Sequence, residues 1–157
     1  MEVRLELLTD PSDYVDTILD WHWREWSAYA TDPSQEEWRQ RLFERCNEAR
    51  IPFSFAAFSD GQVIGYVAVC EEDLDPRFPD RGPWISGMYV LGGARNGGVG
   101  RALLAAAEAH AAALGITELW LHTGEASAFY ERCGWNVVAP KETLAIDAVM
   151  NRTLGAE

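Results

Sequence analysis

A glycine-rich segment between a strand-like run and a helix-like run constrains the fold of this chain most strongly. Five glycines lie between positions 92 and 100. Trp84–Val90, which precedes them, is rich in strand-forming residues. Residues 101–114, which follow them, are rich in alanine and leucine, and Gly115 is a natural C-cap. The sequence therefore predicts a strand, a tight turn and a helix in immediate succession.

This arrangement predicts an anion-binding loop. The first N–H groups of a helix have no partner within the helix, and the helix dipole favours negative charge at that end. Glycines let the backbone approach a phosphate closely. Arg95 and Arg101 add positive charge here, in a chain whose formal net charge is −12. Together these features favour a cradle for an anionic ligand over a flexible loop whose glycines serve only tight turning.

Two common phosphate-binding motifs do not fit the letters of this loop. A P-loop needs Gly-Lys followed by Ser or Thr, whereas Gly100 is followed by Arg101 and Ala102. A dinucleotide fingerprint needs a third glycine three residues after Gly100, where Leu103 stands. The loop therefore predicts a phosphate-containing ligand of another class.

The rest of the chain predicts a single α/β domain over residues 1–157. Asp60 and Gly61 are typical of a tight hairpin, and Ser34 with Glu37 forms a capping-box pattern. We expect strands at residues 3–7, 53–58, 63–70, 84–90, 118–123, 135–139 and 143–152, and helices at residues 11–26, 34–49, 101–114 and 126–133. This order predicts an α/β sandwich around one mixed sheet.

Charge and cysteine content exclude several classes of protein. A sequence pI of about 4.6 without a basic stripe argues against nucleic-acid binding, and an acidic surface should repel anionic membranes. The first residues do not resemble a secretory signal, and no apolar run is long enough to span a membrane. Cys46, Cys70 and Cys133 form no CxxC pair. Reduced thiols and a cytoplasmic location are the simplest expectation.

Two motifs resemble those of the GNAT acetyltransferases. Arg95-x-x-Gly98-x-Gly100 matches the family's pyrophosphate motif, Gln/Arg-x-x-Gly-x-Gly/Ala. Residues 126–135 look like its second signature, A-x-x-F-Y-x-x-x-G-F/W, and one helix and one strand separate the two motifs, as in the family. The resemblance implies the GNAT fold. In that fold helices flank a mixed, mostly antiparallel, twisted sheet, and the central strands splay apart.

The resemblance also implies a reaction. GNAT enzymes transfer an acetyl group from acetyl-CoA to an amine that attacks the thioester directly. The acceptor would be a primary amine on a small molecule or a peptide N-terminus. A backbone N–H near Val90 would stabilise the developing oxyanion, and Tyr130 would protonate the departing thiolate. The residues implied to bind the cofactor are Met88, Tyr89, Val90, Arg95, Asn96, Gly97, Gly98, Val99, Gly100 and Arg101.

The sequence departs from the family at the general base. Many GNAT enzymes carry a glutamate in the strand before the loop, but residues 85–88 contain no carboxylate. The base is then a water relay, a residue from elsewhere, or unnecessary. Thr123 stands where many relatives have an asparagine that contacts the cofactor. A non-catalytic acyl-CoA sensor and a protein-interaction module therefore stay as alternative functions. Tyr130 could also serve only packing. A homodimer is compatible with an enzyme and with a sensor.

The three histidines have different expected roles. His122 lies on the predicted strand at residues 118–123, which in the GNAT fold faces the cofactor cleft. It could act as a general base or be a packed or solvated side chain. His22, in a tryptophan-rich helix, could line an acceptor pocket or belong to the core. His110 is expected to be structural. The histidines and the scattered carboxylates do not have the spacing of metal ligands, so we predict no metal site.

A run of acidic residues lies before the predicted strand at residues 84–90, which the resemblance assigns to cofactor binding. It contains Glu71, Glu72, Asp73 and Asp75. Such a run is usually a solvated turn, but it could also face a cationic acceptor. The second reading predicts a preference for a polyamine, an aminoglycoside or a basic peptide N-terminus.

Overall fold

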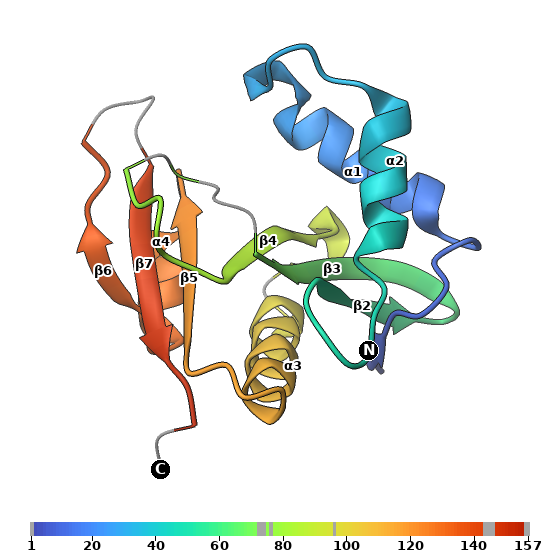
Figure 1. The fold of residues 1–157 in the computed structure, drawn as a ribbon. Helices are drawn as coiled ribbons and strands as arrows, with labels where there is room; N and C mark the ends of the chain where they lie inside the picture. Colours follow the sequence, from blue (N-terminus) through green and yellow to red (C-terminus); the bar gives the residue numbers. More distant parts are fainter. Residues whose placement is uncertain (1, 72–74, 76, 96, 143–146, 156–157) are drawn as a thin grey trace.

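The computed structural model describes residues 2–71, 75, 77–95, 97–142 and 147–155 (Figure 1). The strands are β1 (Arg4–Leu7), β2 (Phe53–Ser59), β3 (Gln62–Cys70), β4 (Trp84–Val90), β5 (Glu118–Thr123), β6 (Asn136–Ala139) and β7 (Ala148–Thr153). The helices are α1 (Val15–Trp26), α2 (Gln35–Glu44), α3 (Val99–Ala113) and α4 (Ser127–Arg132), with short 3-10 turns η1 (Ser27–Tyr29) and η2 (Gly92–Ala94).

The strands form one sheet of order β1-β2-β3-β4-β5-β7-β6. β4 and β5 are parallel, and the other neighbours are antiparallel. This arrangement confirms the predicted mixed, mostly antiparallel α/β fold.

Helices cover both faces of the sheet, with α1 and α2 on one face and α3 on the other (Figure 1). Successive strand residues point to opposite faces, so each strand supplies both layers. Tyr66 packs in the cluster that contains Ile18 of α1. Val67, the next residue of β3, packs in the cluster that contains Leu103 of α3. Burial on both faces explains why the sequence of β3 is an almost continuous apolar run.

The structure confirms a helix cap and a hairpin turn that short sequence motifs predicted. The Ser34 hydroxyl accepts a hydrogen bond from the Glu37 N–H at 3.2 Å, which caps α2. Asp60 and Gly61 have φ angles of 53° and 77°, as a tight hairpin with two left-handed residues requires.

Three predicted boundaries differ from the structure by more than two residues. α1 begins at Val15 because a turn bonded from the Tyr14 N–H to the Pro11 carbonyl precedes it. α2 ends at Glu44, where the Asn47 side chain donates to the Glu44 carbonyl and replaces a further helical turn. β7 begins at Ala148, and the predicted strand start at 143–146 lies outside the described residues.

β4 and β5 are paired at one end only. In these two fully described strands the register contains a single pair, Trp84 with Trp120. The Trp120 N–H also donates to the Pro83 carbonyl at 2.9 Å. Beyond this point the strands diverge, and Figure 1 shows β5, β7 and β6 turned away from β2 and β3. The predicted splay of the central strands is therefore confirmed.

A bulge in β4 accompanies the splay. The register between β3 and β4 shifts between Tyr66 and Ala68, opposite the part of β4 that contains Gly87. Gly87 has a φ of +68°, a left-handed conformation that favours glycine. A bulge of this kind bends the strand and re-aims its backbone groups.

Candidate functional site

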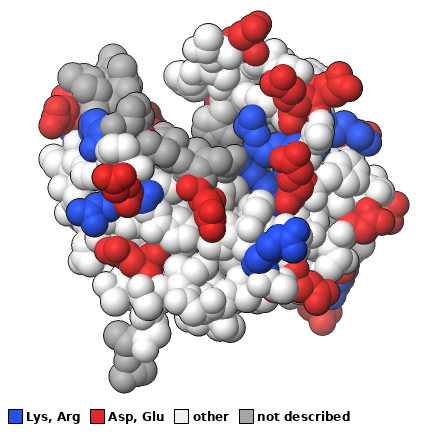
Figure 2. Space-filling model, viewed as in Figure 1, with Lys and Arg blue, Asp and Glu red and all other residues white. Residues whose placement is uncertain are grey.

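A groove of about 1310 Å³ opens where β4 and β5 diverge. One wall comes from β4, through residues 85–88 and Val90, and the facing wall comes from residues 121–126. The start of α3, part of α4 and the helices α1 and α2 complete the lining. Figure 2 shows this face of the molecule hollowed between the part that carries α1 and α2 and the part that carries β6 and β7.

The loop before α3 presents backbone donors at one end of the groove. Gly98 is the N-cap of α3, with a φ of +83°. The Ala102 N–H donates to the Gly98 carbonyl at 3.0 Å, so the N–H groups of the three residues between them have no partner inside the helix. A Cβ atom on Gly98 would point into open space, whereas one on Gly100 would lie 3.3 Å from the Phe129 ring. Gly98 therefore leaves room for a ligand, and Gly100 lets α3 pack closely.

Arg95 and Arg101 hold positive charge at this end of the groove. Arg95 Nε donates to the Val90 carbonyl at 2.7 Å. Arg101 Nη2 donates to the Arg132 carbonyl at 3.2 Å. Both arginines line the groove. The backbone thus holds two guanidinium groups beside the N–H groups of α3 that have no partner inside the helix, which is the environment that an anion requires.

The groove collects most of the residues predicted to bind a cofactor. The predicted residues that line it are Met88, Val90, Arg95, Gly98, Gly100 and Arg101. The Tyr89 ring instead stacks on Trp21 at 5.0 Å, and the Val99 side chain is buried in the core. Neither residue is part of the groove lining. Gly97 is exposed but is not part of the lining, and Asn96 lies outside the described residues.

The Val90 amide lies on the open edge of β4. The Leu91 N–H donates to the Ile64 carbonyl at 2.8 Å, so Leu91 directs its amide toward β3. Successive residues of a strand direct their amides to opposite edges, so the Val90 N–H faces the side from which β5 has diverged. The Val90 carbonyl, on the same edge, accepts from Arg95. The Val90 N–H therefore faces the opening between β4 and β5.

Tyr130 lies on α4, and its side chain is both packed and part of the groove lining. Its ring contacts Phe129 and Trp135, with centroids 5.0 and 6.1 Å away, and the residue is 6% exposed. Burial raises the pKa of the Tyr130 hydroxyl above its usual value. The hydroxyl therefore stays protonated at neutral pH and can donate a proton or a hydrogen bond into the groove.

His22 holds the bulge of β4. Its Nε2 lies 3.0 Å from the Gly87 carbonyl, and because a carbonyl only accepts, Nε2 carries the proton. Burial lowers the pKa of His22 to about 4, so the ring is neutral at physiological pH. A Cβ atom on Gly87 would lie 3.0 Å from His22 Cε1, which explains why glycine is needed there. His22 thus belongs to the core and also lines the groove.

We expect stability to fall as the pH decreases from about 6.5 to 4, because an unfolded histidine binds a proton that native His22 excludes. The folded pKa is depressed, so this contribution is fully present above pH 6.5 and is lost as the pH falls toward 4. The loss attributable to His22 should reach about 3 kcal/mol. Urea unfolding of the wild type and of His22→Gln at several pH values measures it. Equal pH dependence of the two proteins would contradict the assignment.

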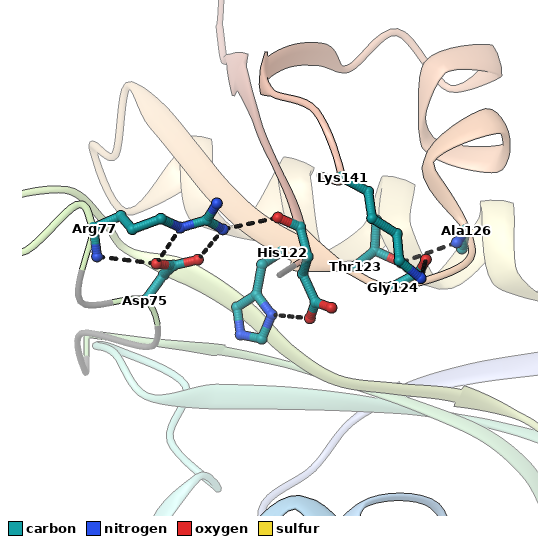
Figure 3. Close-up of polar contacts among 8 residues, drawn as sticks. Asp75, Arg77, His122, Thr123, Gly124, Ala126 and Lys141 are labelled. Atoms are coloured by element: carbon teal, nitrogen blue, oxygen red, sulfur yellow. Dashed lines mark hydrogen bonds and ion pairs between the residues drawn. The ribbon is translucent and has the colours of Figure 1, made fainter. Parts of the chain in front are cut away.

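A second polar cluster includes His122, on the groove wall formed by residues 121–126 (Figure 3). His122 Nδ1 lies 2.9 Å from Asp147 Oδ2, and both residues line the groove. Arg77 donates to both carboxylate oxygens of Asp75, at 2.9 and 2.7 Å, and to the Asp147 carbonyl at 2.8 Å. Lys141 Nζ donates to the Gly124 carbonyl at 2.9 Å.

The acidic run does not act as predicted at Asp75. Asp75 is buried and paired with Arg77, whose hydrogen bonds lower the pKa of the Asp75 carboxyl. Residues 72–74 lie outside the described part of the chain. Among the described lining residues the cations are Arg41, Arg45, Arg95, Arg101, Arg132 and Lys141, and the carboxylates are Glu25, Glu125 and Asp147. The lining of the groove is thus more basic than the chain as a whole, and the preference for a cationic acceptor stays a prediction.

The other candidate residues lie outside the groove. His110 Nε2 lies 2.8 Å from the Glu48 carbonyl, and its ring packs on Phe53 at 4.6 Å, as a structural histidine would. None of the three cysteines forms a disulfide. In the described ranges no group of three or more His, Cys, Asp or Glu side chains could hold a metal ion. Within the same ranges no helix combines the length and apolar character needed to cross a bilayer.

Comparison with known proteins identifies the family. The sequence matches the model of the acetyltransferase (GNAT) family over residues 15–135, most of the chain. One similar solved structure is an aminoglycoside 6'-N-acetyltransferase complexed with coenzyme A, at 17% identity and a TM-score of 0.74 over 100% of this chain and 99% of that one. A GNAT acetyltransferase from Staphylococcus aureus aligns at 14% identity and a TM-score of 0.71, over 97% of this chain and all of its own.

The PaiA N-acetyltransferase from Thermoplasma acidophilum, in complex with coenzyme A, aligns at 17% identity and a TM-score of 0.65, over 98% of this chain and 99% of its own. At these identities the likeness concerns the fold. No curated protein matches the sequence. The family model, the splayed sheet and the glycine loop at the start of α3 agree, and the chain belongs to the GNAT acetyltransferases, whose acyl donor is acetyl-CoA.

Proposed function

We propose that the protein transfers an acetyl group from acetyl-CoA to a primary amine, on a small molecule or a peptide N-terminus, by direct attack in a ternary complex. The observation that carries the proposal is that one groove contains the free N–H groups of α3, the open edge of β4 at Val90, and Tyr130. Bound acetyl-CoA would supply the activated thioester.

The start of α3 has the chemistry to hold a pyrophosphate. The three N–H groups that follow Gly98 can donate to phosphate oxygens, and the missing Cβ of Gly98 leaves open space for a close approach. Arg95 and Arg101 add charge at the same end. Met88 and Val90, further along the groove, would contact the pantetheine arm with the open edge of β4.

Val90 and Tyr130 have different chemical roles in this proposal. The Val90 N–H would donate to the negative charge that develops on the acyl oxygen, and a preorganised donor stabilises such charge because it needs no reorientation. The Tyr130 hydroxyl, kept protonated by burial, would donate its proton to the departing sulfur. The two donors act on different atoms of the breaking thioester.

A non-catalytic acyl-CoA sensor is the second candidate. Residues 85–88 of β4 contain no carboxylate, so this strand offers no general base. A sensor would bind the cofactor through the same loop but release no thiol. Tyr130 in the groove favours the enzyme, because a sensor has no departing sulfur to protonate.

Two measurements test the proposal and separate it from the alternative. We expect calorimetry to show saturable binding of acetyl-CoA, and free-thiol detection to show coenzyme A release that depends on an added amine. The amine panel would contain an aminoglycoside, a polyamine, an arylalkylamine with a single amino group, an amino acid and peptides with free N-termini. Binding without thiol release for any amine would support the sensor, and no binding at all would overturn both.

A further inference from the structure

We propose that His122 is the general base of the transfer reaction and that Asp147 is its positioning residue. The inference rests on the proposed amine acetylation and assigns the base that β4 lacks. It follows from the hydrogen bond between the two side chains, from their place in the groove and from the contacts that hold Asp147.

The hydrogen bond to Asp147 determines which nitrogen of His122 is basic. His122 Nδ1 lies 2.9 Å from Asp147 Oδ2, and an ionised carboxylate can only accept, so Nδ1 carries the proton of the neutral ring. Nε2 then has a free lone pair. Figure 3 shows this second nitrogen of His122 on the opposite side of the ring from its dashed hydrogen bond. The geometry therefore leaves Nε2 as the proton acceptor.

His122 stands on the wall of the groove that faces β4. It lines the same groove as Met88, Val90 and Tyr130, and residues 85–88 form the opposite wall. The Trp84 ring packs beside it, with centroids 6.3 Å apart. Its side chain is 34% exposed, which leaves it open to a ligand in the groove. An amine that reaches the thioester from this side would pass His122.

Asp147 is itself held in place. Arg77 Nη2 donates to the Asp147 carbonyl at 2.8 Å and to Asp75 Oδ2 at 2.7 Å, which ties the loop before β4 to the segment before β7 (Figure 3). Asp75 is buried and accepts two hydrogen bonds from the Arg77 side chain, which fix the guanidinium that holds the Asp147 carbonyl. A fixed carboxylate beside a histidine fixes the tautomer and the orientation of the ring, which is how a positioning residue acts on a base.

The proposed step balances protons and electrons. His122 Nε2 accepts one proton from the acceptor ammonium, and the freed lone pair of the amine nitrogen forms the new bond to the acyl carbon. The carbon–sulfur bond breaks, its electron pair leaves on sulfur, and Tyr130 donates a proton to that sulfur. The second amine proton and the proton on His122 pass to solvent, and solvent restores the Tyr130 proton.

Kinetics of matched histidine variants test the base. We expect His122→Gln to lower kcat/KM about 100-fold for an amine from the panel, within the usual range for loss of a general base. Affinity for acetyl-CoA, measured by calorimetry, should stay unchanged. Added imidazole should partly restore the rate of His122→Ala. The control is His110→Gln, because His110 also has one ring nitrogen bound to a protein oxygen but lies outside the groove lining, and its rate should equal that of the wild type.

The tautomer provides a readout that does not depend on activity. Long-range ¹⁵N–¹H NMR of histidine-labelled protein at pH 8 should show neutral His122 protonated at Nδ1. In Asp147→Asn the amide can also donate, so the Nε2-protonated form should appear and kcat/KM should fall. A wild-type ring protonated at Nε2, or His122→Gln with undiminished thiol release, would overturn this inference alone. A wild type that releases no thiol with any amine would overturn the proposed function and this inference with it.

Discussion

Replacing Gly98 with valine is expected to weaken acetyl-CoA binding at least about 100-fold, because the new side chain would occupy the open space in front of the α3 N–H groups and remove about 3 kcal/mol of charge-assisted hydrogen bonds. Gly98 has a φ of +83°, so any side chain there also strains the backbone by about 1–3 kcal/mol. Calorimetric titration with acetyl-CoA measures the first effect, and urea unfolding measures the second.

Two glycines separate the loss of binding from backbone strain. Gly61, in the β2–β3 hairpin, has a φ of +77° and open space around its Cβ position, but it lies outside the groove lining. Gly61→Val should therefore lose similar stability and keep full affinity. Gly93, in η2 of the loop before α3, also faces open space but has no positive φ. Gly93→Val should therefore lose little stability and little affinity for acetyl-CoA. If Gly98→Val bound acetyl-CoA as well as Gly61→Val, the pyrophosphate would not lie at Gly98.

The parts of the fold that were predictable from sequence depend on short-range interactions. The α3 loop is an example, because the N-cap, the glycines and the helix formers that build it are neighbours in sequence. The caps and turns at Ser34 and Gly61 follow from the same kind of local chemistry. The splay of β4 from β5, in contrast, was predicted only from the resemblance to GNAT enzymes, since no local pattern specifies where two parallel strands separate.

The features that sequence reasoning missed depend on contacts between distant residues. His22 and Gly87 are 65 positions apart, and only the folded sheet shows that one holds the bulge formed at the other. A glycine inside a strand was the available signal, because such a glycine often marks a bulge. His122 and Asp147 are 25 positions apart, so nothing in the sequence showed that the histidine has a carboxylate partner. Asp75 appeared to be part of a solvated acidic run, but its carboxylate is buried and is paired with the partly exposed Arg77.

These contacts change how the site is interpreted. The missing carboxylate in β4 appeared to favour a sensor, whereas the proposed His122–Asp147 pair would place the base on the opposite wall of the same groove. The two polar clusters of the groove differ in the charge that they offer a ligand. The start of α3 presents backbone donors and two arginines to an anion. The wall formed by β5 presents His122, whose second ring nitrogen lies opposite its bond to the Asp147 carboxylate.

Replacing Tyr130 with phenylalanine is expected to lower kcat about 100-fold or more, in the range usual for loss of a general acid. The hydroxyl would act on charge that appears only as the carbon–sulfur bond breaks, so its loss should fall on kcat and leave acetyl-CoA affinity unchanged. The phenylalanine ring keeps the contacts with Phe129 and Trp135, so the fold should be retained. Single-turnover kinetics and calorimetry measure the two effects separately.

Burial bears on this prediction in two ways. It raises the pKa of Tyr130, which makes the hydroxyl a weaker acid, but the same burial also penalises a thiolate formed beside it and so raises the affinity of that sulfur for a proton. The proton transfer therefore stays feasible inside the groove. Tyr14→Phe is the control, because the Tyr14 ring packs on Phe58 outside the groove lining and burial also raises its pKa, yet it has no reacting atom to serve. If Tyr130→Phe and Tyr14→Phe turned over at the same rate with chemistry rate-limiting, the Tyr130 hydroxyl would serve packing alone.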